Sequence, residues 1–421
     1  MIENKNIYKM DILKFITAGS VDDGKSTLIG RLLYDTDSIL EDQLEAIKNA
    51  NRKNDDGTVD LAILTDGLKA EREQGITIDV AYKYFQTDKR KFIIADTPGH
   101  IQYTRNMVTG ASGADLAIIL IDARKGVIEQ TIRHTFLVSL LNIQHVLVCV
   151  NKMDMVDYDQ ESFVKIKDDY LQFSNKLTIQ NIEFIPVSAL RGDNIVVKSK
   201  NMPWYHGPSL LHFLETVDVK PFATSGKGRF PVQWIVRPQT DELHDYRGYA
   251  GRVVGGTFKV GDEVAIMPSG FRSIITHIEL NNEQKANAEE GESVIIRLKD
   301  DIDISRGDLI VSAADIPEVT KDLEASICWM DLRPLDLSQT YLLQVNSKLS
   351  RVKIQDIVHK VNINTLEEIP ADSFSLNDIG KVRIRSADEL ALDTYAENKA
   401  TGGAILIDSR TNLTVGALMF S

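Results

Sequence analysis

One short segment, residues 19–26 (GSVDDGKS), constrains the fold more than any other part of the sequence, because it fits the pattern G-x-x-x-x-G-K-[ST]. The apolar run 13–18 precedes it directly, and an amphipathic stretch follows it. This order predicts a buried strand, a loop and a helix whose first backbone N–H groups bind phosphate. We expect Lys25 to reach the β- and γ-phosphates and the Ser26 hydroxyl to bind Mg2+. The segment therefore predicts a nucleotide site, without choosing between ATP and GTP.

The first half of the chain, residues 13–217, alternates short apolar runs with amphipathic stretches. The apolar runs lie at 13–18, 92–95, 116–121, 146–150 and 184–187, and the helical patterns lie at 26–33, 130–141 and 163–173. Fully apolar strands that alternate with helices are typical of a mostly parallel sheet covered on both faces. We therefore predict an α/β, P-loop domain.

The pattern changes after a Pro/Gly/Ser-rich stretch at 221–228, which we interpret as a linker. From residue 230 the apolar runs are short, alternating and punctuated by glycine, as in a small antiparallel barrel. A weaker break at 313–318 precedes a second all-β stretch, 326–420. The predicted domains are a nucleotide-binding domain at 1–219 and two small antiparallel β-barrels at 220–315 and 316–421.

The charge balance excludes some classes of protein: 48 basic minus 61 acidic residues gives a net charge of −13. This argues against a general nucleic-acid coat protein or a polybasic membrane binder, although one local basic face remains compatible with it. Residues 1–10 lack the apolar core of a signal peptide, and no apolar stretch approaches the ~18 residues of a membrane span. Cys149 and Cys328 are far apart in the sequence and are expected to be small buried hydrophobes. We therefore predict a cytoplasmic protein with no membrane segment.

A second motif, residues 151–154 (NKMD), follows the apolar run 146–150. The Asp154 carboxylate is expected to accept hydrogen bonds from N1–H and the 2-amino group of guanine, and adenine lacks that pair of donors. Asn151 would brace the loop, and Lys152 would lay its stem over the base. The string is weak evidence alone, but Ser188, Ala189 and Leu190 follow the next apolar run in the expected order. Together these motifs predict guanine as the base.

A third motif, residues 96–100 (DTPGH), stands at the end of the run 92–95. An acidic side chain there, Asp96, is placed to hold Mg2+ through water, and Gly99 supplies a backbone N–H near the γ-phosphate. His100 is expected to position the attacking water. The alternative for His100 is an ordinary solvent-facing loop histidine, which its place beside Gly99 makes the weaker interpretation.

A fourth segment, residues 75–79 (GITID), contains Thr77, which is expected to bind Mg2+ and contact the γ-phosphate. Such a segment would order with GTP and loosen with GDP. The alternative is the start of an ordinary strand. The charged residues before it, Lys69, Glu71 and Glu73, are expected to form a solvated helix face.

These motifs, in this order and along the whole chain, resemble the translation-factor class of GTPases, the relatives of elongation factor Tu. The resemblance implies a catalytic set of His100, Lys25 and Thr77, and Mg2+ ligands from Ser26, Thr77 and Asp96. The expected contacts with the nucleotide are Gly19, Ser20, Val21, Asp22, Asp23, Gly24, Lys25, Ser26, Thr27, Asp96, Thr97, Pro98, Gly99, His100, Asn151, Lys152, Asp154, Ser188, Ala189 and Leu190.

Within this class the phosphate loop departs from the elongation factors, which usually have histidines where this chain has Ser20 and Asp23. The loop, residues 60–84 and strings such as RFPVQWIVRP and RGYAGRVVGGTFKVGDEV look instead like the GTPase subunits of bacterial sulfate adenylyltransferases. A bifunctional form with a fused adenylylsulfate kinase would need a second phosphate loop, and these 421 residues contain only one.

That resemblance implies a subunit with GTP and Mg2+ as cofactors and a smaller catalytic subunit as partner. The complex would convert ATP and sulfate to adenosine 5′-phosphosulfate and pyrophosphate, the entry step of sulfate assimilation. ATP and sulfate are expected to bind the partner, and the segments 75–79 and 96–105 are candidates for the partner-facing surface. Two alternatives remain: an elongation-factor-like carrier of aminoacyl-tRNA and a stand-alone regulatory GTPase. The partner recovered from cells, a sulfurylase-type subunit, tRNA or neither, would separate them.

Overall fold

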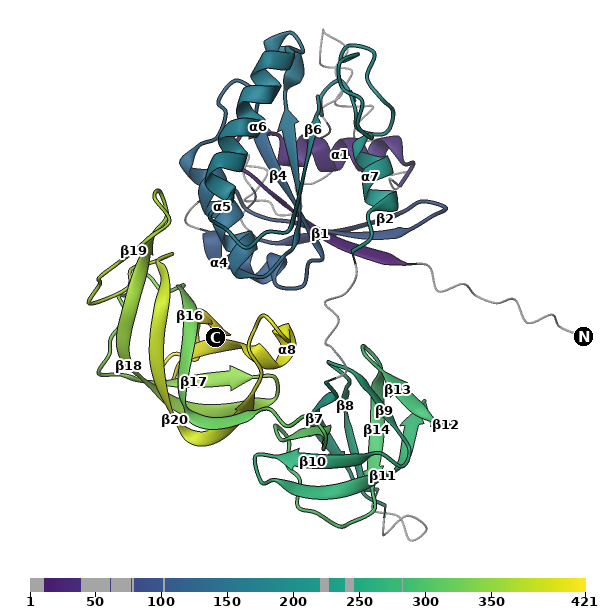
Figure 1. Cartoon of the computed structure of the whole chain (residues 1–421), viewed down its shortest axis with the longest axis vertical. Helices are drawn as coiled ribbons and strands as arrows, with labels where there is room; N and C mark the ends of the chain where they lie inside the picture. Colours follow the sequence, from purple (N-terminus) through teal and green to yellow (C-terminus); the bar gives the residue numbers. More distant parts are fainter. Residues whose placement is uncertain are drawn as a thin grey trace, which may run out of the picture. The chain divides into compact units, whose positions relative to one another are not determined.

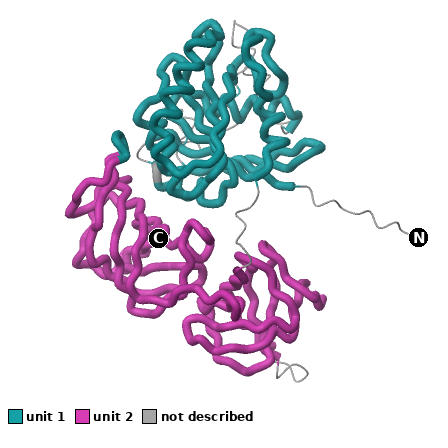
Figure 2. Tube along the Cα trace, in the orientation of Figure 1, with its two compact units in different colours: residues 1–219, 363–366 teal, residues 220–362, 367–421 magenta. Residues whose placement is uncertain are grey.

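The structure, a computed structural model, describes residues 11–38, 61, 77, 79–100, 103–219, 227–238, 246–281 and 283–421. Most of the predicted linker at 221–228 and of the segment 75–79 lies outside the described residues, as do Lys69, Glu71 and Glu73. Its internal contacts divide the chain into two compact units (Figure 2). One comprises residues 1–219 with 363–366, and the other comprises 220–362 with 367–421.

A six-stranded sheet in the order β2-β3-β1-β4-β5-β6 is the centre of the first unit (Figure 1). Every neighbouring pair is parallel except β2 with β3. The strands are β1 Ile12–Ala18, β2 Ala81–Gln86, β3 Lys91–Asp96, β4 Leu116–Asp122, β5 His145–Asn151 and β6 Asn181–Pro186. The helices are α1 Lys25–Asp35, α4 Thr104–Ala111, α5 Glu129–Leu140, α6 Gln160–Ser174 and α7 Leu210–Thr216, with a 3-10 turn η3 at Met153–Val156. The predicted α/β class is confirmed.

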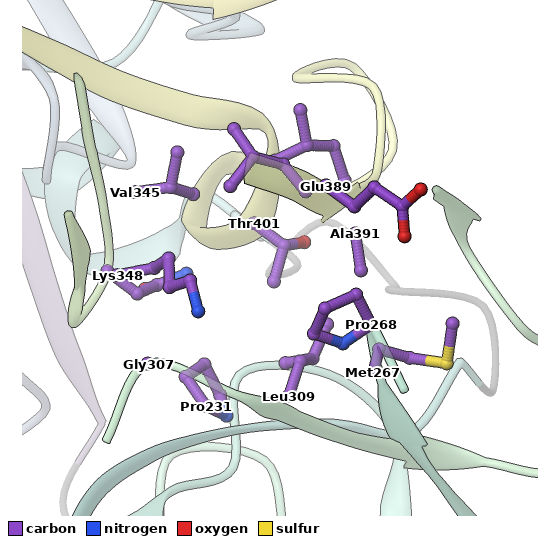
Figure 3. A pocket seen from close by; sticks show the side chains of 13 residues that line it. Pro231, Met267, Pro268, Gly307, Leu309, Val345, Lys348, Glu389, Ala391 and Thr401 are labelled. Carbon is purple, nitrogen blue, oxygen red and sulfur yellow. The ribbon is translucent and has the colours of Figure 1, made fainter. Parts of the chain in front are cut away.

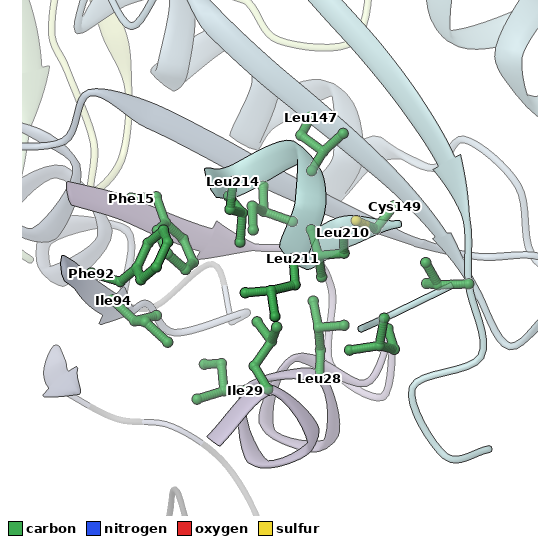
Figure 4. Packing of buried hydrophobic residues seen from close by; sticks show 14 of the residues in the cluster. Phe15, Leu28, Ile29, Phe92, Ile94, Leu147, Cys149, Leu210, Leu211 and Leu214 are labelled. Atoms are coloured by element: carbon green, nitrogen blue, oxygen red, sulfur yellow. The ribbon is translucent and has the colours of Figure 1, made fainter. Parts of the chain in front are cut away.

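Apolar side chains of α1 and α7 pack in one cluster against this sheet (Figure 4). On α1, Leu28 and Leu32 recur at helical spacing and are fully buried. Phe85 on β2 and Phe92 on β3 pair across the strands and stack with their ring centroids 4.4 Å apart. Because burial of each such side chain contributes about 1.5–3 kcal/mol, the cluster fixes α1 against the sheet. The start of α1 is thereby held where β1 ends.

Strand β1 is the switch point of this sheet, because β3 lies on one side of it and β4 on the other. Ligands of open α/β sheets bind outside the carboxyl ends of the strands at such a point. The segments 19–26, 96–100, 151–154 and 188–190 follow or end the parallel strands β1, β3, β5 and β6. The fold therefore brings four of the sequence motifs to one edge of the sheet.

The second unit contains two closed antiparallel rings, each of six strands. In the first, β10 pairs with both β15 and β11, which closes the order β10-β15-β7-β8-β14-β11. Its strands are β7 Arg229–Val236, β8 Gly248–Arg252, β10 Glu263–Met267, β11 Phe271–Leu280, β14 Ser293–Leu298 and β15 Leu309–Ser312. Three short strands accompany it, β9 Thr257–Lys259, β12 Glu283–Lys285 and β13 Asn287–Glu289.

The second ring follows the order β17-β21-β22-β16-β20-β18 and closes through β17 with β18. Its strands are β16 Glu318–Trp329, β17 Thr340–Val345, β18 Lys348–Asn362, β20 Ile379–Leu392, β21 Gly403–Asp408 and β22 Thr414–Phe420. A short strand, β19 Glu367–Ile369, and a single turn, α8 Lys399–Gly402, complete it. Two small barrels after an α/β domain are as predicted, while the boundaries at 219/220 and 315/316 stay predictions.

A buried ion pair joins the two barrels within the second unit. Arg229 of β7 is fully buried, and its guanidinium donates two hydrogen bonds of 2.8 Å to the Asp393 carboxylate. Thr401 donates to the same carboxylate at 2.5 Å. A cavity of about 30 Å³ lies beside this pair, between residues of both barrels that include Pro231, Leu309 and Lys348 (Figure 3). The charges of Arg229 and Asp393 are thus paired with each other, and the cavity has room for little more than a water molecule.

Within the described residues, every helix falls short of the length and apolar character that a membrane-spanning helix needs. The cytoplasmic location stays a prediction.

Candidate guanine-nucleotide site

The loop between β1 and α1 has the backbone that its glycines predict. Gly24 caps α1 with φ +92°, a left-handed conformation that side chains with a Cβ rarely adopt. A Cβ at this position would also lie 2.5 Å from the Asn151 amide nitrogen. Glycine is therefore required both for the turn and for the close approach of β5, and the free N–H groups of α1 face the loop.

Lys25, the first residue of α1, is 8% exposed, and its ammonium donates to the carbonyls of Gly19 at 2.8 Å and Ser20 at 2.9 Å. Burial lowers its pKa, against which the carboxylates of Asp96 and Asp23 act. A Cβ on Gly99 would lie 2.5 Å from this ammonium. The charge of Lys25 is thus enclosed by the phosphate loop and the segment after β3, where an anion would meet it directly.

Asp96 and Thr97 anchor the end of β3 to β1. The Asp96 carboxylate, 1% exposed, accepts a 3.2 Å hydrogen bond from the Thr17 hydroxyl. Thr97 donates in turn to the Thr17 carbonyl at 2.6 Å. These contacts fix the start of the 96–100 segment beside the phosphate loop.

A cleft of about 280 Å³ opens at this edge of the sheet, and Thr77 and His100 line it together with the phosphate loop. The His100 ring meets the edge of the Tyr103 ring, with centroids 6.2 Å apart and planes at 75°. The lining residues are Val21, Asp22, Gly24, Lys25, Ser26, Thr27, Thr77, Gly99, His100 and Lys152. The structure therefore brings the predicted catalytic residues and the hydroxyls of Ser26 and Thr77 to one cavity.

The other predicted contacts are not part of the lining of that cleft. They are Gly19, Ser20, Asp23, Asp96, Thr97, Pro98, Asn151, Asp154, Ser188, Ala189 and Leu190. Several of them build the loops that surround it, as the contacts of Asn151 and Asp154 demonstrate.

Asn151 connects three loops. Its amide nitrogen donates to the Asp23 carbonyl at 2.8 Å, and its amide oxygen accepts from the Ala189 backbone N–H at 2.9 Å. Asn151 is 2% exposed, so both hydrogen bonds are shielded from water. Asp154 accepts a 2.6 Å hydrogen bond from the Ser188 hydroxyl. The two loops expected to contact the base are thus bonded to each other and to the phosphate loop.

Asp122, the last residue of β4, is a part of this site that the sequence motifs did not predict. Its carboxylate is 1% exposed and accepts from Arg124 at 2.6 and 3.0 Å, and Lys152 lies 3.1 Å away. Burial acts to raise the pKa of Asp122, but these hydrogen bonds prevail and hold it well below the usual range. Lys152 also donates to the Asp22 carbonyl. The one sequence signal is that Asp122 ends the apolar run 116–121 with a charged side chain, which does not by itself reveal the contact with Lys152.

Arg31 is a second missed residue. From the second turn of α1 it donates to the Ala189 carbonyl at 3.2 Å and the Leu190 carbonyl at 2.6 Å. It also forms a helical ion pair with Asp35 at 3.5 Å. Arg31 therefore ties the phosphate-loop helix to the loop after β6.

The donor set suits a hard cation held mostly by a nucleotide. No group of three or more His, Cys, Asp or Glu side chains that could hold a metal alone occurs among the described residues. Two hydroxyls in the cleft, Ser26 and Thr77, and the buried carboxylate of Asp96 provide oxygen ligands only. Mg2+ typically takes one or two protein ligands and completes its shell with phosphate oxygens and water. The residues present therefore fit Mg2+ bound together with a nucleotide.

Comparisons with known families agree with this geometry. Residues 10–221 match the elongation factor Tu GTP binding domain, and residues 322–420 match the GTP-eEF1A C-terminal domain-like family. The first match covers half of the chain and contains every predicted site residue. The fold and the site thus define a guanine-nucleotide-binding protein of the elongation factor Tu class.

Curated relatives identify the family more closely. The chain is 50% identical over 411 residues to sulfate adenylyltransferase subunit 1 of Citrobacter koseri, covering 96% of this chain and 85% of that protein. It is 51% identical over 413 residues to the protein of the same name from Cronobacter sakazakii, covering 97% and 86%. This chain belongs to the sulfate adenylyltransferase subunit 1 family.

Proposed function

We propose that this chain is the GTPase subunit of a heteromeric sulfate adenylyltransferase. It couples GTP hydrolysis to the formation of adenosine 5′-phosphosulfate and pyrophosphate from ATP and sulfate. The observation that carries the proposal is the 50% identity to proteins named sulfate adenylyltransferase subunit 1 over 96% of this chain, barrels included. The name "subunit 1" implies a partner subunit, and we assign the sites for ATP and sulfate to it.

Guanine is selected by Asp154, whose carboxylate accepts from N1–H and the 2-amino group of the base. The 2.6 Å hydrogen bond from Ser188 orients that carboxylate. Lys152, held by Asp122 at 3.1 Å, covers the face of the base. Adenine would leave the Asp154 acceptors unpaired, and a buried unpaired acceptor costs about 1–3 kcal/mol.

The phosphates bind over the phosphate loop. Lys25 exchanges the carbonyls of Gly19 and Ser20 for β- and γ-phosphate oxygens, and the first N–H groups of α1 contribute a positive end. Ser26 and Thr77 would hold Mg2+ directly, and Asp96 would hold it through water. When bound, Mg2+ neutralises charge that develops on the phosphate oxygens.

Hydrolysis is carried by positioning and electrostatics, as in other phosphoryl transfers. His100 lines the cleft with Gly99 and Lys25, so its imidazole orients a water molecule toward the γ-phosphate. The Tyr103 ring supports the imidazole from its edge. Lys25 stabilises the charge on the departing phosphate.

Formation of a mixed anhydride of sulfate and phosphate is thermodynamically unfavourable. Coupling to GTP hydrolysis therefore draws this reaction forward. The partner has to bind the GTP and GDP states with different affinity, since a ligand shifts an equilibrium only by its differential affinity. Segments 75–79 and 96–105 adjoin the γ-phosphate and are the parts whose contacts would differ between the two states.

The GTPase rate of the full chain tests this proposal directly. We expect slow hydrolysis by the chain alone and faster hydrolysis when the small catalytic subunit, ATP and sulfate are all present. Two matched controls are measured: the complete mixture without sulfate, and the complete mixture without the small subunit. A rate that responds to aminoacyl-tRNA and not to ATP and sulfate would favour the elongation-factor-like carrier instead.

A further inference from the structure

A buried carboxylate lies inside the phosphate loop itself. Asp23 is 2% exposed, and its Oδ2 accepts a 2.6 Å hydrogen bond from the Ser20 backbone N–H. Its other oxygen, Oδ1, is buried and has no hydrogen-bond partner among the described residues. An ionised carboxylate with one unsatisfied buried oxygen is costly, so its place beside a phosphate site needs a physical explanation.

Among the charged side chains that act on this carboxylate, Lys25 favours its ionised form most. Burial raises the pKa of Asp23, and the Ser20 N–H followed by the Lys25 charge opposes that effect. Lys125 also favours the ionised form, whereas Asp122 disfavours it. The influence is mutual, because Asp96 and Asp23 are the two carboxylates that most favour the charged form of Lys25. Without a nucleotide, Asp23 therefore helps to keep a buried ammonium charged.

A bound nucleotide makes the Asp23 charge unfavourable, whereas in the empty loop that charge stabilises the ammonium of Lys25. Its phosphates take over the compensation of Lys25 and bring several negative charges to the loop whose buried side already carries Asp23. Like charges close together in a partly buried site repel each other strongly, and no described residue donates a hydrogen bond to Oδ1. The free energy of the carboxylate is thus lower in the empty loop than in the filled one.

We propose that Asp23 stabilises the nucleotide-free phosphate loop and thereby speeds the release of guanine nucleotides. In this function the residue acts through Lys25 and does not contact the reacting atoms. Faster GDP release shortens the interval between successive rounds of coupling to a partner's reaction. The inference rests on the guanine-nucleotide site and is independent of the chemistry at ATP and sulfate.

Two substitutions separate the charge of Asp23 from its hydrogen bond. Asp23→Asn removes the charge but keeps an oxygen that accepts from the Ser20 N–H. Asp23→Ala removes both. Asp168→Asn is the matched control, because it changes the net charge equally at an exposed position of α6. The measurement is the dissociation rate of N-methylanthraniloyl-GDP from the full chain, followed by fluorescence after excess unlabelled GDP is added.

We expect Asp23→Asn to release the labelled GDP roughly tenfold more slowly than the wild type, and Asp168→Asn to match the wild type. The difference should persist at 0.5 M KCl, because a buried charge is poorly screened by salt. Release from Asp23→Asn at the wild-type rate or faster would overturn the proposal. Faster release from Asp23→Ala together with an unchanged Asp23→Asn would assign Asp23 to the loop turn alone. Slow release from Asp23→Ser, which keeps a short acceptor, supports the proposal if the asparagine variant does not fold.

The assay needs no partner, ATP or sulfate. A failure of sulfate-dependent coupling would therefore leave its result unaffected. Failure of the wild type to bind the labelled GDP would overturn both this inference and the proposed guanine-nucleotide site.

Discussion

The side-chain amide of Asn151 donates a 2.8 Å hydrogen bond to the backbone carbonyl of Asp23, across 128 residues of sequence. The bond fixes the loop that is expected to read the base onto the loop that is expected to bind phosphate. The second bond of Asn151, to the Ala189 N–H at 2.9 Å, adds the loop after β6. One buried amide thus sets the geometry of three segments.

Asn151→Ala should weaken GDP and GTP binding alike, because both nucleotides use the same three loops. Loss of two buried hydrogen bonds at about 1 kcal/mol each predicts a roughly 30-fold rise in Kd. Isothermal titration with each nucleotide measures it. A selective loss of GTP binding alone would contradict a purely architectural role for Asn151.

Asp154→Asn should change the preferred base. The variant loses the double acceptor for guanine and gains an amide that can donate to the 2-carbonyl of xanthine. We expect GTP affinity to fall at least tenfold and xanthosine triphosphate to become the better ligand. The switch is measured by letting GTP and xanthosine triphosphate each compete with labelled GDP for the nucleotide site. Unchanged GTP affinity would remove Asp154 from the base-binding loop.

His100→Ala should slow hydrolysis while leaving nucleotide binding nearly intact. Orientation of a water molecule lowers the reaction barrier and contributes little to the ground state, so single-turnover hydrolysis should slow about 100-fold. Single-turnover GTP hydrolysis and the GTP Kd are measured on the same sample. Equal losses in rate and affinity would point to a structural role for His100.

The stability of the first unit should fall as the pH falls below 7, in part because of His134 on α5. Burial first, and then the positive charges of Lys25 and Arg133, lower the pKa of His134 from 6.5 to about 3. Below pH 6.5 His134 is protonated in the unfolded chain but stays neutral in the folded chain. Its contribution to the free energy of unfolding is therefore present above pH 6.5 and is lost as the pH falls toward 3.

Between pH 7.5 and 5.5 the histidine term amounts to about 1.4 kcal/mol. Urea unfolding of wild type and His134→Gln at these two values measures it, and the variant should lose less stability on acidification. The comparison uses the change in the free energy of unfolding between the two pH values in each protein, because the substitution also alters packing and so the absolute stability. Parallel losses in both proteins would show that His134 is protonated in the folded state.

Much of the fold could be predicted from the sequence because its strands carry the pattern of their burial. Every residue of β4 is buried, and the apolar run 116–121 predicts this strand. Strand β2 was not predicted. It is one of the two edge strands, with Tyr82 and Tyr84 at least half exposed, so it presents no continuous apolar run. Its conformation follows from antiparallel pairing with β3, the next strand of the hairpin, and an apolar-run search does not detect such pairing.

The residues of the site also fall into those that the sequence predicts and those that it does not. Lys25, Asn151 and Asp154 lie in motifs whose spacing reflects a local turn, so pattern matching found them. Asp122 and Arg31 act through side chains that reach other loops, and no spacing within their own segments reveals this. Asp122 contacts Lys152 only because β4 and β5 are neighbours in the sheet.

Thr77→Ala should uncouple the subunit without destroying its nucleotide site. The substitution removes one proposed metal ligand and one tether of the segment 75–79, while Lys25 and Asp154 remain. We expect near-normal GDP binding and a loss of the GTP-bound state that the partner senses. Full retention of coupling in the variant would show that segment 75–79 is not the switch.

The most direct measurement of the central claim is pyrophosphate release from ATP and sulfate by the full chain reconstituted with the small catalytic subunit, with GTP or GDP present. The account predicts that GTP stimulates release by the wild-type complex, that GDP does not, and that Thr77→Ala abolishes the stimulation although Thr77 contacts neither ATP nor sulfate. Equal pyrophosphate release with GTP and GDP in the wild-type complex would contradict it.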